Sequence, residues 1–357
     1  MTRTSTTTTI RDLAKLAGVS IGTVSLALNN RPGVSEATRR RVLELAAKAD
    51  YQPHAIARQL ALRRTRCIGL VILNIRRHAE IYPSSWSYFY HIILGINDTL
   101  RTRGYKLDLE ICDVDDMHGP TLFDFAGRGA LDGLFIVLQW DKQPTSLLKA
   151  IESNIPIVLI NGALTEDLAA VGVDNYGVAE NAVDHLHSLG HTEIAFIGGP
   201  FDHLNVQDRL AGFKQAMQKR GLPITEHRIV ESDFQIAGGY RAMMRILGKD
   251  ERVTAVFCAN DLMAVGAVQA IQHRGLRVPD DISVVGTDDD LTGQVITPPL
   301  TTIRQPVRQM GIEAAQQLLQ LIDGSGNRRR LFLASELIRR RSTGPRSREP
   351  VSPGKGG

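Results

Sequence analysis

From residue 67 onward, short apolar runs alternate with longer stretches that repeat at helical spacing. The apolar runs predict strands at Ile68–Leu73, Leu107–Ile111, Gly133–Leu138, Ile157–Ile160, Ile194–Ile197, Ala255–Cys258 and Ile282–Val285. The stretches between them predict helices at 88–103, 177–189, 208–220, 237–247 and 261–274. Strands separated by helices of this length are typical of βαβ units with parallel sheets, and their number indicates two doubly wound lobes.

The first fifty residues have a different pattern, which predicts short helices. Thr9 can cap the first helix, with Asp12 reaching back to it as in a capping box. Gly18 stands where a helix commonly ends in a left-handed residue. The expected buried face of this helix is Leu13, Ala14 and Ala17.

Two more helices follow in this segment. Ser20 can cap a second helix with Val24 and Leu28 facing inward, and Ser35 can cap a third. The third helix is expected to complete the core with Val42, Leu43 and Ala46. A short helix, a glycine turn and a second short helix together predict a helix-turn-helix.

The second helix of such a unit places its N-terminal residues at base edges in the major groove of DNA. We expect Ile21, Gly22 and Leu26 to point toward bases. We expect Ser20, Thr23, Ser25 and Asn29 to hold phosphates or sugars. Each hydroxyl taken singly is explained as well by a helix cap or a solvated surface, but the set in this frame favours DNA.

The charge distribution agrees with a DNA-binding head. The whole chain of 357 residues carries a formal charge of +4, which is unremarkable for a composition of 43% hydrophobic and 22% charged residues. Residues 1–66, however, hold twelve Lys/Arg and four Asp/Glu, so this segment is at +8 and the remainder is at −4. A basic head on a mildly acidic body indicates a nucleic-acid-binding module joined to a different kind of domain.

A short connecting segment, 51–65, follows the head. Pro53 fits the first turn of another helix, whose apolar residues are Ile56, Ala57 and Leu60. This helix is too short to be stable alone, so it can act as a hinge that orders on binding. Leu60 could then insert into the minor groove as an apolar wedge. An ordinary linker helix is the alternative.

Several classes of protein are disfavoured. Cys67, Cys112 and Cys258 lie far apart, without the spacing of a zinc site or a disulfide framework. The N-terminus has no pattern of a secretory signal, and the longest apolar run, Ile68–Leu73, is too short to cross a bilayer. HExxH, GxSxG and GxxxxGK[ST] motifs are missing. We therefore expect a cytoplasmic, nucleoid-associated protein that is not an enzyme and that needs no cofactor or metal.

The body offers a candidate ligand site, because ligands of open α/β sheets bind beyond the carboxyl ends of strands. Polar residues follow predicted strands or flank their loops, and aromatic residues stand in two of these loops. The expected effector-binding set is Trp86, Tyr88, Phe89, Asn161, Arg209, Phe234, Asn260 and Asp288. Carboxylate, amide and guanidinium groups between aromatic walls suit a polyhydroxylated ligand. The run Asp288–Asp290 is better explained as a solvated turn than as a metal site.

These residues resemble those of the lactose-repressor (LacI/GalR) family of bacterial transcription regulators. The resemblance rests on Thr23-Val24-Ser25 in the second helix, on Tyr51-x-Pro53, and on markers of the body such as Val285-Gly286-Thr287-Asp288 and Pro299–Pro306. It implies a body of the type I periplasmic-binding-protein-like fold, in which two lobes close on a small molecule. It also implies that Arg209, Asn260 and Asp288 contact the effector, and that repression is the default activity.

Two positions depart from the family pattern. Leu26 stands where Arg is common, and His54 where Asn is common. Arginine would favour guanine through two hydrogen bonds, whereas leucine offers only apolar contact. We therefore expect an operator without the usual guanine preference. The expected DNA-contacting residues of the hinge are His54, Ala57 and Leu60.

The expected organisation has four parts. A helix-turn-helix domain spans 1–50, the hinge 51–65, the effector-binding and dimerisation domain 66–345, and a disordered tail 346–357, where Pro and Gly are frequent after Arg341. The first lobe is expected at 66–162 and 293–321, and the second at 163–292 and 322–345. One helix-turn-helix covers little DNA, so we expect a homodimer on double-stranded DNA with a pseudo-palindromic operator. A sugar-binding receptor of transport or chemotaxis, without DNA function, is the alternative.

Overall fold

The computed structural model describes residues 8–28, 32–49, 51, 64–74, 86–113, 124, 126, 128, 130–140, 151–152, 155–162, 167–250 and 252–346. The chain divides into two compact units, Met1–Thr65 and Arg66–Gly357, which we call the head and the body. None of the described helices combines the length and apolar character needed to cross a membrane.

The head is built from the helices α1 (Ile10–Ala17), α2 (Ile21–Leu28) and α3 (Glu36–Lys48). The predicted capping box is confirmed: the backbone N–H of Asp12 donates to the Thr9 hydroxyl and the backbone N–H of Thr9 donates to the Asp12 carboxylate. Gly18 has φ +62°, which is the left-handed conformation expected there. The buried core is Leu13, Ala14, Ala17, Val24, Ala27, Val42 and Ala46.

One prediction for the core of the head is wrong. Leu43 is 46% exposed, because α3 turns Val42 and Ala46 inward and leaves the neighbouring position on the outer side. Two arginines of α3 tie the helices together through their guanidinium groups. Arg41 donates to the carbonyl of Ala17 at the end of α1, and Arg39 donates to that of Ala27 near the end of α2, at 3.4 Å. These bonds satisfy carbonyl groups that a helix end leaves unpaired.

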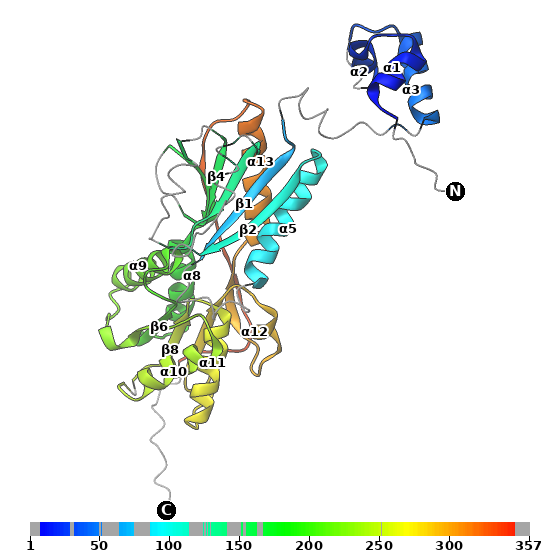
Figure 1. The fold of residues 1–357 in the computed structure, drawn as a ribbon. Helices are drawn as coiled ribbons and strands as arrows, with labels where there is room; N and C mark the ends of the chain where they lie inside the picture. Colours follow the sequence, from blue (N-terminus) through cyan, green and yellow to red (C-terminus); the bar gives the residue numbers. More distant parts are fainter. Residues whose placement is uncertain are drawn as a thin grey trace, which may run out of the picture. The chain divides into compact units, whose positions relative to one another are not determined.

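The body consists of two six-stranded sheets (Figure 1). The first has the order β11-β5-β4-β3-β1-β2 and is parallel throughout. Its strands are β1 (Cys67–Asn74), β2 (Lys106–Asp113), β3 (Gly133–Val137), β4 (Ile157–Ile160), β5 (Ala169–Val173) and β11 (Arg330–Leu333). Helices α5 (Trp86–Thr102) and α13 (Val307–Ile322) pack on each other beside it. This is the first lobe.

The second lobe is built around the sheet β12-β10-β9-β8-β6-β7, in which only β12 runs antiparallel to its neighbour. Its strands are β6 (Ile194–Gly198), β7 (Ile229–Glu231), β8 (Ala255–Cys258), β9 (Ser283–Thr287), β10 (Thr301–Arg304) and β12 (Glu336–Ile338). Its helices are α8 (Asn175–Ser188), α9 (Leu204–Lys219), the 3-10 helix η2 (Glu226–Arg228), α10 (Ile236–Leu247), α11 (Asp261–His273) and α12 (Leu291–Val295).

Glycine sets the closest helix contacts in each lobe. A Cβ on Gly95 of α5 would lie 2.3 Å from the carbonyl oxygen of Arg308 in α13, and one on Gly311 would lie equally close to that of Ile92. In the second lobe, α10 and α11 approach in the same way, because a Cβ on Gly266 would lie 2.0 Å from the carbonyl oxygen of Ile236. Substitution at any of these positions would force the helices apart.

The three crossovers between lobes are confirmed, but the predicted lobe boundaries are wrong. The chain crosses between β5 and α8, between β10 and α13, and between β11 and β12. The first lobe therefore keeps 167–173 and reaches 333, while 293–304 belongs to the second lobe. The prediction missed β5, β7, β10, β11 and β12. Of these, β5 is built of small residues, and the buried Thr301 and Thr302 of β10 look polar in the sequence.

Hydrogen bonds hold the end of the body in place up to Gly344. Ser342 is fully buried: its hydroxyl donates to the carbonyl of Val284 at 2.6 Å and accepts from the backbone N–H of Thr301 at 2.7 Å. His185 and Thr343 are hydrogen-bonded at 2.9 Å, and the imidazole of His191 lies 3.1 Å from the carbonyl oxygen of Gly344. Small polar residues thus fasten this segment to α8 and β9. Residues 347–357 lie outside the described part.

Candidate functional site

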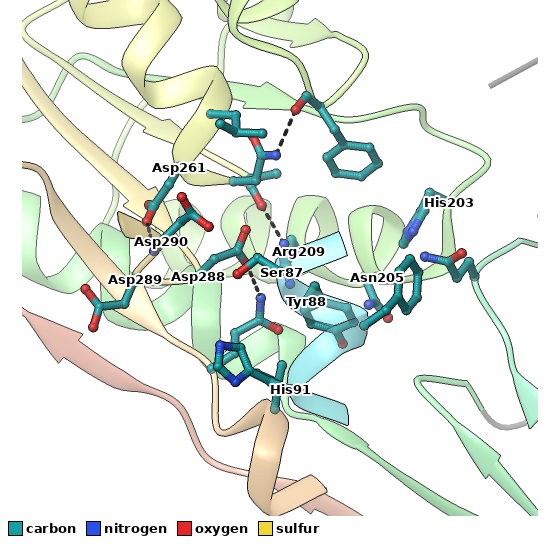
Figure 2. A pocket seen from close by; sticks show the side chains of 18 residues that line it. Ser87, Tyr88, His91, His203, Asn205, Arg209, Asp261, Asp288, Asp289 and Asp290 are labelled. Atoms are coloured by element: carbon teal, nitrogen blue, oxygen red, sulfur yellow. Dashed lines mark hydrogen bonds between the residues drawn. The ribbon is translucent and has the colours of Figure 1, made fainter. Parts of the chain in front are cut away.

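A cavity lined by residues of both lobes lies between the two lobes of the body (Figure 2). The first lobe contributes Ser87, Tyr88, Phe89, His91, Gln139 and Val307. The second lobe contributes His203, Asn205, Arg209, Phe234, Ala259, Asn260, Asp261, Leu262, Asp288, Asp289, Asp290 and Gln305. Six of the eight predicted effector-binding residues line this cavity.

Arg209 is the buried cation of the cavity. It lies in the second turn of α9, and its guanidinium donates from Nε to Asn175 Oδ1 at 2.8 Å and from Nη1 to the carbonyl of Ala259 at 2.5 Å. Burial lowers the pKa of Arg209, and the nearby Asp288 carboxylate opposes this shift. Asn175 and Ala259 come from the start of α8 and the end of β8, so three elements fix the orientation of this guanidinium.

Asp288 faces Arg209 from the end of β9. Burial raises its pKa to about 7, against the opposing effect of the Arg209 charge. Its Oδ1 accepts a 2.5 Å hydrogen bond from Nε2 of Gln305, which stands at the crossover from β10 to α13. Asp288 is therefore a hydrogen-bond acceptor whose carboxylate is held by Gln305 from the crossover between the lobes.

The three consecutive carboxylates do not form the solvated turn that we expected. Asp289 is buried and pairs with Arg304 at 2.8 Å and with Arg340. Asp290 caps α12 by accepting from the backbone N–H of Thr292 at 2.8 Å. Each side chain thus points to a different partner, and only Asp288 remains available to a ligand. The described residues contain no cluster of His, Cys, Asp and Glu arranged to hold a metal ion.

Asp261 ties the turn after β9 to β10. Its carboxylate accepts from the Thr302 hydroxyl at 2.6 Å and from the backbone N–H of Asp290 at 2.7 Å. Burial and the neighbouring Asp288 raise its pKa well above the usual range. A Cβ at Gly286 would lie 2.2 Å from Asp261 Oδ1, so the glycine lets α11 approach β9 this closely.

Asn260 and Phe234 both line the cavity, but their polar contacts are structural. Asn260 caps α11 by accepting from the backbone N–H of Met263 at 2.9 Å, and its amide donates to the carbonyl of Phe234 at 2.9 Å. Phe234 adopts φ +60°, a left-handed conformation that aims its ring at Gly199. A Cβ on Gly199 would lie 2.2 Å from that ring, so the glycine makes room for the aromatic wall.

The remaining predicted effector residues divide into three cases. Tyr88 and Phe89 line the cavity from the first turn of α5, at the start of the predicted helix 88–103. Asn161 does not line the cavity. Its Oδ1 accepts a 2.7 Å hydrogen bond from the Tyr88 hydroxyl and so orients the tyrosine ring. Trp86 begins α5, and its side chain lies outside the described residues.

The sequence prediction missed the residues that join the lobes. The backbone N–H of Leu204 in the second lobe donates to the carbonyl of Gln139 in the first at 2.8 Å, and Trp140 forms an isolated antiparallel bridge with His203. The rings of Trp140 and His203 are 4.9 Å apart, and those of His203 and Phe234 are 5.1 Å apart. A strand-end rule cannot find this contact, because His203 precedes a helix.

The predicted DNA-reading surface lies on and before α2 in the head. Ser20, Ile21 and Gly22 are exposed, while Thr23, Ser25 and Leu26 are half-buried. The Ser20 hydroxyl caps α2 by accepting from the backbone N–H of Thr23 at 3.1 Å. Asn29, His54, Ala57 and Leu60 lie outside the described residues.

Comparisons with known proteins agree with both units. Residues 9–54 match the family model "Bacterial regulatory proteins, lacI family", and residues 183–343 match a "Periplasmic binding protein-like domain". The chain is 36% identical over 317 residues to "Probable HTH-type transcriptional repressor ExuR" of Bacillus subtilis (strain 168), covering 88% of this chain and 91% of that protein. The chain belongs to the LacI family of bacterial transcription regulators, and it is a DNA-binding regulator and not an enzyme.

Two solved structures resemble most of this chain. A complex of the transcriptional regulator CelR with cellobiose is 31% identical, with a TM-score of 0.70, covering 94% of this chain and 99% of that one. The lac repressor dimer bound to operator and an anti-inducer is 28% identical, with a TM-score of 0.76 and the same coverage. The two-lobe body with parallel-rich sheets is therefore the fold of this family.

Proposed function

We propose that this chain is a transcriptional repressor whose operator binding is controlled by a small carbohydrate bound between the two lobes. The observation that carries the proposal is the cavity, in which the buried Arg209 and Asp288 stand opposite aromatic rings from the other lobe. Hydrogen-bonding groups with apolar walls suit the hydroxyls and the ring face of a sugar. CelR, which has the same fold, was solved with cellobiose.

The proposed effector set is centred on Arg209 and Asp288. Gln305, Asn205 and His203 join them, although the sequence did not single them out. Tyr88, Phe89 and Phe234 supply the aromatic walls. Asn161 accepts a hydrogen bond from the Tyr88 hydroxyl, and Asn260 donates one to the backbone carbonyl of Phe234. Trp86, whose side chain lies outside the described residues, stays in the proposed effector-binding set.

The proposed operator-binding set is Ser20, Ile21, Gly22, Thr23, Ser25, Leu26 and Asn29, with His54, Ala57 and Leu60 from the hinge. Exposure of the first turn of α2 supports major-groove reading. Closure of the lobes on the effector would shift the hinge, and such coupling free energies are typically about 1–3 kcal/mol. The site of action is then the bacterial nucleoid, in the cytoplasm.

We further propose a homodimer that assembles through the body. Exposed large apolar side chains support this assembly in both lobes: Tyr90, Leu109, Ile111, Leu291 and Val295 are each at least 46% exposed. Leu109 and Ile111 lie on β2, an edge strand of the first sheet. The lac repressor structure is described as a dimer. Sedimentation at micromolar concentration should show a dimer, and a dominant tetramer would contradict this assembly.

The function is tested by measuring operator binding with and without sugars. The operator is first obtained by selection from random DNA, and fluorescence anisotropy then reports its affinity across a panel of neutral sugars and other small metabolites. A sugar that changes the operator affinity of the native chain should leave that of Asp288→Asn unchanged. Asp323→Asn, an isosteric change on the exposed end of α13, serves as the matched control and should respond as the native chain does.

A further inference from the structure

The charges that line the cavity are unevenly distributed. Among the described lining residues, four are aspartates and only Arg209 is a lysine or arginine. Asp289 is neutralised by Arg304 and Arg340, and Asp290 is held at the start of α12. What faces a ligand is therefore one guanidinium together with Asp288, with Asp261 close behind. An incoming anion would meet no surplus of positive charge there.

Arg209 is also held within the protein, although its guanidinium carries five N–H donors. Two of its N–H groups are taken by Asn175 and by the carbonyl of Ala259, and the Asp288 carboxylate interacts with its charge. A ligand carboxylate or phosphate that approached the guanidinium would be placed beside Asp288. Like charges brought together in a desolvated site cost several kcal/mol.

Two side-chain amide oxygens of the cavity lining are buried hydrogen-bond acceptors without a donor among the described residues. Gln305 donates through Nε2 to Asp288, which leaves its Oε1 buried without a partner among the described residues. Asn205 Oδ1 is buried and has no partner there either. Buried acceptors of this kind are costly until a donor reaches them. Hydroxyl groups donate hydrogen bonds, whereas ionised carboxylates and phosphates only accept them.

We propose that the effector is an uncharged, hydroxyl-rich ring molecule, and that the cavity excludes sugars that carry a carboxylate or a phosphate. This inference rests on the proposed function of the cavity. Hydroxyls of the ligand donate to Gln305 Oε1, Asn205 Oδ1 and Asp288, while a ring face lies against Phe234 or Tyr88. The selectivity comes from the acceptor-rich lining and not from size, since a uronic acid and its parent sugar have nearly the same shape.

The test is isothermal titration calorimetry on the full chain at pH 8, with matched sets of probes. Each set holds a neutral sugar, the corresponding uronic acid and the corresponding 6-phosphate, for galactose, glucose and mannose, and cellobiose is added as a neutral disaccharide. We expect a neutral probe to bind at least about 100-fold more tightly than its charged counterparts. A uronic acid or sugar phosphate that binds as tightly as its neutral parent, or more tightly, overturns the proposal.

The variant Asp288→Asn tests the cause. Loss of the carboxylate should weaken the neutral probe and strengthen its uronic acid, so that the ratio of their affinities falls at least about tenfold. Asp323→Asn is the control, and an unchanged ratio in Asp288→Asn would contradict the electrostatic explanation.

Operator binding, measured in parallel, separates this inference from the proposed function. If a charged sugar binds and changes operator affinity, the sugar-responsive function stands and the inference fails. If no probe binds while the operator does, the carbohydrate assignment and the inference fail together, and the DNA-binding function stands.

Discussion

The indole ring of Trp140 in the first lobe lies 4.9 Å from the imidazole of His203 in the second, centroid to centroid and nearly edge to face. A backbone hydrogen bond between Leu204 and Gln139 accompanies this contact. His203 also touches Phe234 and lines the cavity. The same imidazole therefore contacts the first lobe and lines the cavity, so the proposed effector binding and lobe closure would meet at this residue.

Loss of the His203 ring should loosen the lobes. His203→Ala removes two edge-to-face ring contacts, each contributing about 0.5–1.5 kcal/mol, and should lower the free energy of unfolding accordingly. In a Trp86→Phe background Trp140 is the only tryptophan, and its fluorescence emission should shift to the red as it becomes wetter. His187→Ala, an exposed histidine of α8, is the control. Unchanged emission in His203→Ala would show that the contact does not hold the lobes together.

The aromatic wall can be displaced without touching a hydrogen-bonding residue. Gly199→Ala introduces a methyl group into the space of the Phe234 ring, so the ring must move. We expect the affinity for the effector to fall about tenfold, or about 1.4 kcal/mol, from lost stacking, with operator affinity in the absence of effector unchanged. Gly248→Ala, at the open end of α10, is the matched control. Equal effector affinity in both variants would exclude a role for the Phe234 ring.

Stability should decline in mild acid because of His185. Burial lowers its pKa to about 4, from an ordinary value of about 6.5. Between these values the unfolded chain binds more protons than the folded one, so stability is complete above pH 6.5 and is lost as pH falls toward 4.

The measurement compares thermal unfolding at pH 7.5 and 5. The native chain should lose about 2–4 °C more than His185→Gln, which can still bond Thr343 but does not titrate. The raised pKa of Asp288 acts in the opposite direction, but it is common to both chains and cancels in the difference. His187→Gln should behave like the native chain. If His185→Gln and the native chain lost the same thermal stability between pH 7.5 and pH 5, His185 would not be the cause of the acid-dependent loss.

Leu26 should determine one position of each operator half-site. Its half-buried side chain offers no hydrogen bond, so selection of binding sites with the native chain should show no strong guanine preference there. Leu26→Arg should introduce one, with about 1–3 kcal/mol of discrimination. Leu16→Arg adds the same charge on the exposed side of α1 and should change no base preference. A strong guanine preference in the native selection would contradict this prediction.

The sequence predicted most of the architecture, because periodicity reports burial directly. The strand runs and the helix-turn-helix with its Thr9–Asp12 box were confirmed. Two of the missed strands have side chains that look wrong for a core. Strand β5 consists of small residues, and the threonine hydroxyls of β10 are polar but are hydrogen-bonded to Asp261 and Thr343. The predicted lobe boundaries were wrong because these two strands were missed.

The candidate site was predicted in part, for a similar reason. Strand-end logic located Arg209 and Asp288, which project from elements around the sheet edge. It could not separate Asn260, whose side chain caps a helix, from residues free to meet a ligand. His203, Asn205 and Gln305 depend on how the lobes face each other, and no local pattern records that arrangement.

The central claim is that one chain couples a sugar-binding cavity to operator binding. Anisotropy titration of the selected operator, repeated at saturating concentration of a neutral sugar that binds the cavity, tests it most directly. The account predicts that operator affinity changes by about 5- to 150-fold in the native chain and not in Asp288→Asn. Equal operator affinity of the native chain with and without the bound sugar would contradict it.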